Sequence, residues 1–171
     1  MTELTHLFNP ESVAVVGASD AEDKYGHKVF RNIIDAGFAG RLYPVNPNVA
    51  AVLGRQTYPS LKDVPEHIDL AFIVIPARFV VDAVRDAIAA GVRGLVIITA
   101  GFGETGEQGR QAEEEIRRLC TEAGIPAVGP NCMGICSFPV RLAGTMEPLK
   151  SEPGQISFIS QSGTYGITTL N

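Results

Sequence analysis

Short apolar runs alternate along this chain with segments in which apolar residues recur every three or four positions. The apolar runs, each of which ends close to a glycine or a proline, span residues 13–16, 41–45, 68–75, 94–99 and 125–128. Runs without polar alternation are typical of strands that are buried on both faces of a parallel sheet. The pattern therefore predicts five buried strands.

The segments between these runs carry a helical spacing. Apolar positions one, three and four apart predict helices over residues 27–36, 79–88 and 112–123. Strands that alternate with helices form a parallel sheet covered on both sides, and right-handed crossovers wind the chain around it. We expect an α/β fold with a Rossmann-like, doubly wound parallel sheet.

The pattern changes after Pro130, where short segments are separated by prolines. Residues 155–159 then predict a fresh strand, which is followed by the start of a helix before the sequence stops at Asn171. We expect a Rossmann-like domain over residues 1–130 and a connector over residues 131–150. Residues 151–171 are expected to open a second domain that has been cut short.

Composition narrows the classes of function. The 171 residues include 14 Lys and Arg against 19 Asp and Glu, a net charge of −5, whereas proteins that bind nucleic acid usually carry a basic face. Three cysteines without metal-ligand spacing predict free thiols in a reducing compartment. No apolar stretch reaches the roughly 18 residues of a membrane span, and the N-terminus lacks a signal-peptide pattern. We expect a cytoplasmic protein with no metal, nucleic-acid or membrane partner.

The loops at the carboxyl ends of the strands are the candidate sites, because ligands of open α/β sheets bind there. The first loop, Gly17-Ala18-Ser19, offers backbone amides and a helix N-terminus to a phosphate. The next glycine is Gly26, so the loop lacks the GxGxxG spacing of dinucleotide-binding proteins. A plain tight turn is the alternative.

The end of the second strand argues against NAD. That cofactor is normally held by Asp or Glu about 20 residues after the glycine loop, but residues 43–48 read YPVNPN and contain no acid. A nucleotide other than NAD is favoured, unless the two prolines only terminate the strand. The chain also lacks the Gly-Lys-Ser or Gly-Lys-Thr sequence of a P-loop.

Other chemically active side chains have simpler interpretations. The three histidines are isolated, and the glutamates at positions 104, 107 and 113–115 suit a helix N-terminus. Cys132 follows a strand, where it either faces a ligand or packs in the core. The segment Ser160-Gln161-Ser162-Gly163 either binds an anion at a helix N-terminus or simply caps the helix.

Five motifs in a fixed order carry a family resemblance. They read VVGAS at 15–19, YPVNP at 43–47, ITAGF at 98–102, GPNCMG at 129–134 and FISQSG at 158–163. Together they resemble the CoA-binding domain of NDP-forming acyl-CoA synthetases, such as ADP-forming acetyl-CoA synthetase, and more distantly the succinyl-CoA synthetase alpha subunit. The resemblance covers nearly the whole chain and implies a flavodoxin-like second domain.

The resemblance also implies that CoA lies across the carboxyl edge of the sheet. The residues implied for its phosphates are Gly17, Ala18, Ser19 and Lys24, and those for its adenosine are Val45, Asn46 and Pro47. The residues implied for its pantetheine arm are Ile75, Pro76, Thr99, Ala100 and Gly101. The thiol would lie toward Asn131 and Cys132, and the acyl and phosphohistidine site toward Ser160, Gln161, Ser162 and Gly163.

The family reaction joins a carboxylic acid to CoA through an acyl phosphate and a phosphohistidine, while NTP becomes NDP and phosphate. The resemblance implies that ATP or ADP with Mg²⁺ binds in a downstream nucleotide-grasp domain or subunit. The phosphorylated histidine would lie beyond residue 171, so we expect this chain to bind CoA without turnover. The acyl group, the choice between ATP and GTP, and the oligomeric state are left open.

The chain departs from the family pattern at one position. Many members carry Lys after Pro-Val-Asn-Pro, where this chain has Asn48. Four basic residues could supply the missing positive charge, namely Lys24, Lys28, Arg41 and Arg55. The sequence does not choose among them.

Three alternative functions accompany the ligase hypothesis. They are the ligase-like region of a protein lysine acetyltransferase, a stand-alone CoA-binding module without catalysis, and a nicotinamide-binding redox sensor. Residues 158–163 argue against the stand-alone module, and the missing acid argues against the redox sensor. We also expect a bulky residue at Gly17 to weaken CoA binding while the fold survives.

Overall fold

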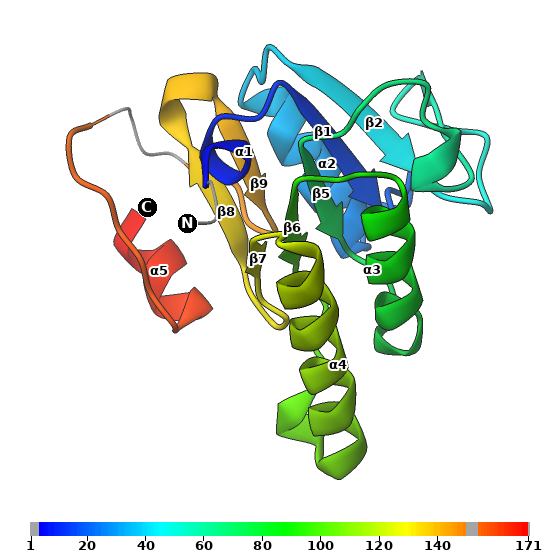
Figure 1. Cartoon of the computed structure of the whole chain (residues 1–171). Helices are drawn as coiled ribbons and strands as arrows, with labels where there is room; N and C mark the ends of the chain where they lie inside the picture. The colour runs from blue at the N-terminus through cyan, green and yellow to red at the C-terminus, as the bar shows by residue number, and fades with distance from the viewer. Residues whose placement is uncertain (1–3, 150–153, 171) are drawn as a thin grey trace.

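The computed structural model describes residues 4–149 and 154–170, and a five-stranded parallel sheet forms its centre (Figure 1). The strands are β1 (Ser12–Val16), β2 (Arg41–Val45), β5 (Leu70–Ile73), β6 (Gly94–Ile97) and β7 (Ala127–Val128). Their order across the sheet is β2-β1-β5-β6-β7, and every neighbouring pair is parallel. The predicted α/β sheet is confirmed.

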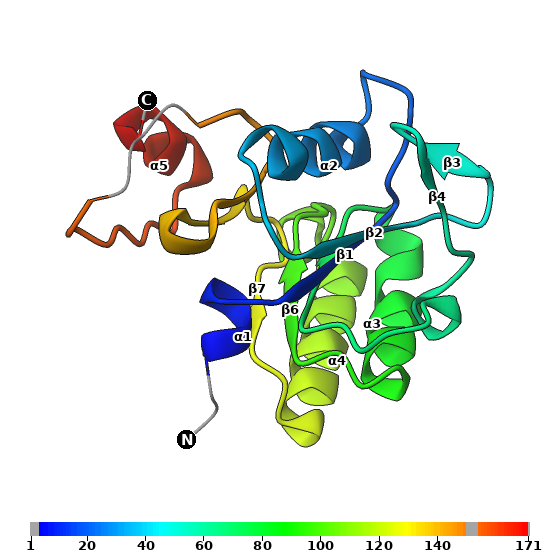
Figure 2. The same cartoon turned by 90° about the horizontal axis from the view of Figure 1, so that it is seen from above.

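Helices cover both faces of the sheet, as the view from above shows (Figure 2). Helix α2 (Tyr25–Asp35) lies on one face, and α3 (Val80–Ala89) and α4 (Glu107–Ala123) lie on the other. Side chains of a strand alternate between faces, so Phe72 packs with Phe30 of α2, while Ile73 packs with Val84 of α3. Helix α4 begins five residues before the predicted start, because its first turn is polar and carries no apolar signal.

A hairpin occupies part of the predicted connector. Strands β8 (Gly134–Ser137) and β9 (Leu142–Thr145) pair antiparallel and pack beside α2, where Leu142 is buried. Asn32 Nδ2 donates to the Thr145 carbonyl oxygen at 2.8 Å. A Cβ at Gly144 would come within 2.0 Å of the Phe72 ring, so the hairpin lies directly on the sheet. The domain boundaries themselves stay predictions.

The remaining elements are short. They are α1 (Thr5–Phe8), the hairpin of β3 (Ala51–Val52) and β4 (Arg55–Gln56), and single 3₁₀ turns at Leu61–Asp63, Ala77–Phe79, Gly103–Thr105 and Phe138–Val140. Helix α1 contacts β6, and Leu7 is buried there.

The predicted strand over residues 155–159 is wrong. This segment forms no strand, and Ile156 and Ile159 are 94% and 93% exposed. A strand needs a neighbour that satisfies its backbone N–H and C=O groups, and no segment among the described residues pairs with this one. The helix expected after it is confirmed as α5 (Gly163–Leu170).

Candidate functional site

The order of the strands reverses between β1 and β5. The chain leaves β1 for β2 on one side and later returns to pair β5 with β1 on the other. Ligands of doubly wound sheets bind in the crevice outside the carboxyl ends of strands at such a point. The loops that flank this crevice are residues 17–24 after β1 and residues 74–76 after β5.

Gly17 lies at this switch point, in contact with both neighbouring loops. Its N–H donates to the Val45 carbonyl oxygen at 2.8 Å. Its φ of +92° suits glycine, and an added Cβ would lie 2.2 Å from the Val74 carbonyl oxygen. Close packing where the ends of β1, β2 and β5 meet therefore requires glycine at position 17.

The loop after Gly17 is tied to the start of α2. The Ser19 hydroxyl accepts from the Ala21 N–H at 3.1 Å, and the Ser19 carbonyl accepts from His27 Nδ1 at 3.0 Å. Helix α2 begins at Tyr25 after Lys24, and no side chain caps it. An uncapped helix N-terminus presents backbone N–H groups and a positive dipole end, which together suit a phosphate.

The loop after β2 is joined to the first loop by Asn46. Asn46 Nδ2 donates to the Ala18 carbonyl oxygen at 2.8 Å, and its Oδ1 accepts from the Asn48 N–H at 2.9 Å. The Val45 side chain is buried in the core, so only its backbone faces the crevice. Pro47 and Asn48 are exposed and form the outer rim.

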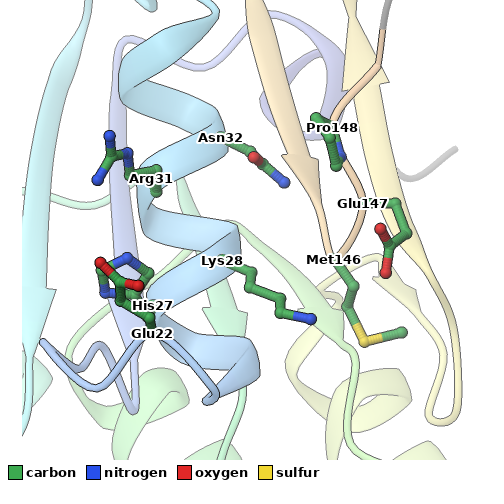
Figure 3. A pocket seen from close by; sticks show the side chains of 8 residues that line it. All are labelled: Glu22, His27, Lys28, Arg31, Asn32, Met146, Glu147 and Pro148. Carbon is green, nitrogen blue, oxygen red and sulfur yellow. The ribbon is translucent and has the colours of Figure 1, made fainter.

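Only one of the four basic candidates lies in the loop at the crevice. Arg41 opens β2 at the opposite edge of the sheet and pairs with Glu66 at 2.8 Å. Arg55 donates to the Leu42 carbonyl oxygen at 3.4 Å. Lys28 lies one turn into α2 and extends toward Met146 (Figure 3), with its Nζ 5.5 Å from the centre of the Tyr25 ring. Lys24, which is exposed and lies 3.7 Å from Asp23, is the cation best placed for the missing charge.

Thr99 connects the loops after β5, β6 and β7. Its hydroxyl donates to the Ile75 carbonyl oxygen at 2.7 Å and accepts from the Ile75 N–H at 3.3 Å. Its own carbonyl oxygen accepts from the Asn131 N–H at 2.9 Å. Thr99, which the resemblance implied for the pantetheine arm, thus holds three loops together through its side chain and its backbone.

The acidic residues near α4 depart from the expected interpretation. Glu107 does stand in the first turn of α4, but Glu104 Oε1 accepts from the Gly101 N–H at 2.6 Å and its Oε2 from the Phe102 N–H at 3.2 Å. Glu113 Oε2 accepts from the Gly103 N–H at 3.0 Å. These loop amides hold the pKa of the Glu104 carboxyl below its usual range. No local sequence pattern predicts these hydrogen bonds between carboxylates and loop amides.

Cys132 packs against the sheet. Its Sγ lies 3.3 Å from the Ile97 carbonyl oxygen, to which the thiol donates. Burial raises the pKa of the Cys132 thiol, as it does for Cys120 and Cys136. The reactive thiolate is therefore disfavoured, which supports the packing interpretation over a role in chemistry.

The segment before α5 lies against the loop that follows β7. A Cβ at Gly163 would come within 2.1 Å of Met133 Cγ. The Ser162 hydroxyl accepts from the Tyr165 N–H at 3.3 Å, which is a cap at the start of α5, and Ser160 Oγ accepts from the Ser162 N–H at 3.1 Å. The structure therefore brings residues 160–163 to the neighbour of Cys132, and both serines make capping contacts.

A groove of about 390 Å³ runs between α2 and the segment after β9 (Figure 3). It is lined by Glu22, His27, Lys28, Arg31, Asn32, Met146, Glu147 and Pro148. Lys28 extends across it toward Met146, whereas Arg31 points the other way and pairs with Asp35. The groove begins beside the loop of residues 17–24, and Lys28 is the residue of its lining that the sequence analysis considered for a site.

Within residues 4–149 and 154–170, no helix is long and apolar enough to cross a membrane. In the same part of the chain, no cluster of three His, Cys, Asp or Glu side chains could hold a metal ion.

Comparison with known protein families identifies the family of this chain. A family model described as a CoA binding domain matches residues 11–137. The chain belongs to the CoA-binding domain family. The matched region runs from the residue before β1 to the end of β8, so this CoA-binding domain includes every strand of the sheet and all five carboxyl-edge loops.

Relatives of this CoA-binding domain are subunits or parts of CoA ligases. The chain is 42% identical over 163 residues to the alpha subunit of acetate–CoA ligase (ADP-forming) II from Pyrococcus furiosus, covering 95% of this chain and 35% of that protein. It is 34% identical over 129 residues to succinate–CoA ligase (ADP-forming) subunit alpha 2 from Archaeoglobus fulgidus, covering 70% and 42%. The resemblance stated from the motifs is confirmed.

A solved structure shares the same architecture. The dinucleotide forming acetyl-coenzyme A synthetase 1 of Ca. Korarchaeum cryptofilum, in complex with phosphate and ADP, superposes with a TM-score of 0.92 at 40% identity. The match covers 99% of this chain and 36% of that one. This CoA-binding domain thus spans about a third of the length of these ligase relatives.

Proposed function

We propose that this chain binds coenzyme A along the carboxyl edge of its sheet, as the CoA-binding part of an NDP-forming acid–CoA ligase. The observation that carries the proposal is the similarity to ADP-forming ligases, which extends over 95% of this chain. The switch point between β1 and β5 supplies a physical basis, because Gly17 and the uncapped N-terminus of α2 lie there.

The phosphates of CoA are proposed to lie against Gly17, Ala18 and Ser19 and the start of α2. Backbone N–H groups at the start of α2 would donate to the phosphate oxygens, and Lys24 would add a positive charge beside them. The adenosine is proposed to lie by Asn46 and Pro47, beside the backbone of Val45. This placement is supported by the Asn46–Ala18 hydrogen bond, which holds the two loops side by side.

The pantetheine arm is proposed to cross the loops after β5 and β6. The segment Ile75-Pro76 and the segment Thr99-Ala100-Gly101 lie next to each other, because Thr99 bonds to Ile75. The arm would end near Asn131 and Cys132, where residues 160–163 approach through Met133. That approach supports a thiol end that lies close to the proposed acyl and phosphohistidine site.

The complete reaction is proposed to need more than this chain. A small carboxylic acid, CoA and NTP would yield acyl-CoA, NDP and phosphate, with ATP or ADP and Mg²⁺ bound in a nucleotide-grasp domain or subunit outside residues 1–171. The solved relative with phosphate and ADP supports nucleotide use by the wider family. Residues 1–171 alone are expected to bind CoA without turnover.

Calorimetric titration of the chain with CoA, and with NADH as the control, tests this proposal. We expect CoA to bind and NADH to give no heat, because no acid follows β2 to hold a nicotinamide ribose. Lys24→Ala should weaken CoA binding about threefold to tenfold. Lys62→Ala is the matched control, since Lys62 pairs with Asp86 away from the crevice.

The outcomes separate the candidate functions. Binding of NADH without CoA would overturn the proposal in favour of a redox sensor. If CoA binds, formation of acyl-CoA by the full-length protein distinguishes a ligase from an acetyltransferase fusion or a stand-alone module. Equal loss of affinity in the Lys24 and Lys62 variants would place the phosphates elsewhere.

A further inference from the structure

Three consecutive backbone N–H groups after β6 are held by the chain's own carboxylates. Gly101 and Phe102 donate to the two oxygens of Glu104 at 2.6 and 3.2 Å, and Gly103 donates to Glu113 at 3.0 Å. Consecutive amides that point the same way form a concavity suited to an anion. Here the carboxylates of Glu104 and Glu113 take the place of such an anion.

The loop needs this support because its backbone makes an unusual turn. Gly101 has a φ of +105°, and a Cβ at this position would lie 3.1 Å from Cβ of Ala77. The next side chain, Phe102, is 1% exposed and enters the core below α3 and α4. The Phe102 carbonyl oxygen meets the Thr105 N–H and hydroxyl, each at 2.8 Å. These two hydrogen bonds stabilise the side of the turn that faces the core.

Glu104 stabilises the outer side of the same turn through hydrogen bonds to backbone amides. Its carboxylate bonds to the amides of the loop and not to those of the first turn of α4, which begins three residues later at Glu107. The loop is anchored on its other flank by Thr99, which bonds to Ile75. Two side chains, Thr99 and Glu104, therefore bracket Ala100 and Gly101.

We propose that Glu104 is a positioning residue, which holds the Thr99-Ala100-Gly101 segment in the shape that receives the pantetheine arm. This inference rests on the proposed CoA site. It assigns no ligand contact to Glu104 itself, because the carboxylate is already bonded to the loop. The pKa of Glu104, which the amides lower, keeps the carboxylate charged at neutral pH.

The test compares CoA with adenosine 3′,5′-bisphosphate, which shares the nucleotide end of CoA but lacks pantetheine. Glu104→Ala should weaken CoA about tenfold, the order expected when two charge-assisted hydrogen bonds that shape the loop are lost. The bisphosphate should keep its affinity within about twofold. Glu104→Gln retains one acceptor oxygen and should fall between wild type and Glu104→Ala for CoA.

Two controls make the result specific. Glu114→Ala removes a carboxylate that bonds only to Arg117 on the exposed face of α4, and it should change neither affinity. Amide exchange at Gly101 and Phe102 should accelerate in Glu104→Ala and report the loosened loop directly. Equal weakening of both ligands, or unchanged CoA affinity in both Glu104 variants, would overturn the inference. Absence of CoA binding to the wild-type chain would instead refute the proposed function.

Discussion

The thiol of Cys132 lies at the carboxyl edge of the sheet, but its surroundings suppress its reactivity. The Sγ atom donates to the Ile97 carbonyl oxygen, and burial raises the pKa of the thiol. A Cβ at Gly129 would lie 3.2 Å from the same sulfur, so the loop packs closely around it. The side chain is therefore a packed, hydrogen-bonded thiol next to a proposed ligand path.

Alkylation of Cys132 tests this description. At pH 8 iodoacetamide should label Cys132 in the native chain at least about tenfold more slowly than in the urea-unfolded chain, because the thiolate is disfavoured and the sulfur is covered. CoA should slow the labelling of Cys132 further, because the end of the pantetheine arm is proposed to lie beside it. Cys120, which belongs to α4 and is buried on the other face of the sheet, serves as the internal reference. Protection of Cys132 alone by CoA would show that the bound ligand reaches it.

Among the elements, α2 is docked on the first loop by two glycines. A Cβ at Gly26, in the first turn of α2, would lie 1.9 Å from the Gly17 carbonyl oxygen. Gly17 in turn lies against the loop after β5, where an added Cβ would be 2.2 Å from the Val74 carbonyl oxygen. The second glycine of the sequence thus serves close packing of a helix on a loop, although its spacing differs from GxGxxG.

Substitution at Gly17 should therefore affect folding as well as binding. The expectation that a bulky residue leaves the fold intact is wrong, because the added atoms would overlap the backbone of the neighbouring loop. Gly17→Ala should lower the free energy of unfolding by more than about 2 kcal/mol, measured by urea denaturation. Gly54→Ala is the matched control: its φ is +76° but nothing lies within 4 Å, so it should cost about 1–2 kcal/mol. Equal costs would show that the loop relaxes.

On the scale of the whole molecule, two apolar clusters sandwich the sheet. One is built mainly with α3 and α4, and the other with α2 and the hairpin of β8 and β9. Among residues whose burial the structure describes, none after Thr145 is buried. The two described clusters contain no residue of α5, and Gly163 at the start of α5 approaches Met133.

A chain that ends at residue 149 should accordingly keep its stability. Its urea midpoint and the steepness of its transition should match those of the 171-residue chain, because the steepness follows the surface exposed on unfolding. Circular dichroism followed against urea concentration measures both. A clearly lower midpoint or a broadened transition would show that residues 154–170 contribute to the core.

Most of the fold could be predicted from the sequence, but the details of the site could not. Residues 41–45 form a strand with the expected bounds, because their apolar run pairs with β1. Residues 155–159 have a similar pattern, yet they stay exposed without a partner strand. The Asn46–Ala18 and Glu104–Gly101 bonds depend on loop geometry, which no local pattern encodes.

By itself the sequence determined the class of fold and the family, because periodicity and ordered motifs are local properties of the chain. Tertiary structure alone decided which side chains are committed to the scaffold. Thr99 and Cys132 bond to carbonyl oxygens of other segments, and Glu104 bonds to loop amides. Such roles depend on which strand ends come together, and that follows from the strand order across the sheet.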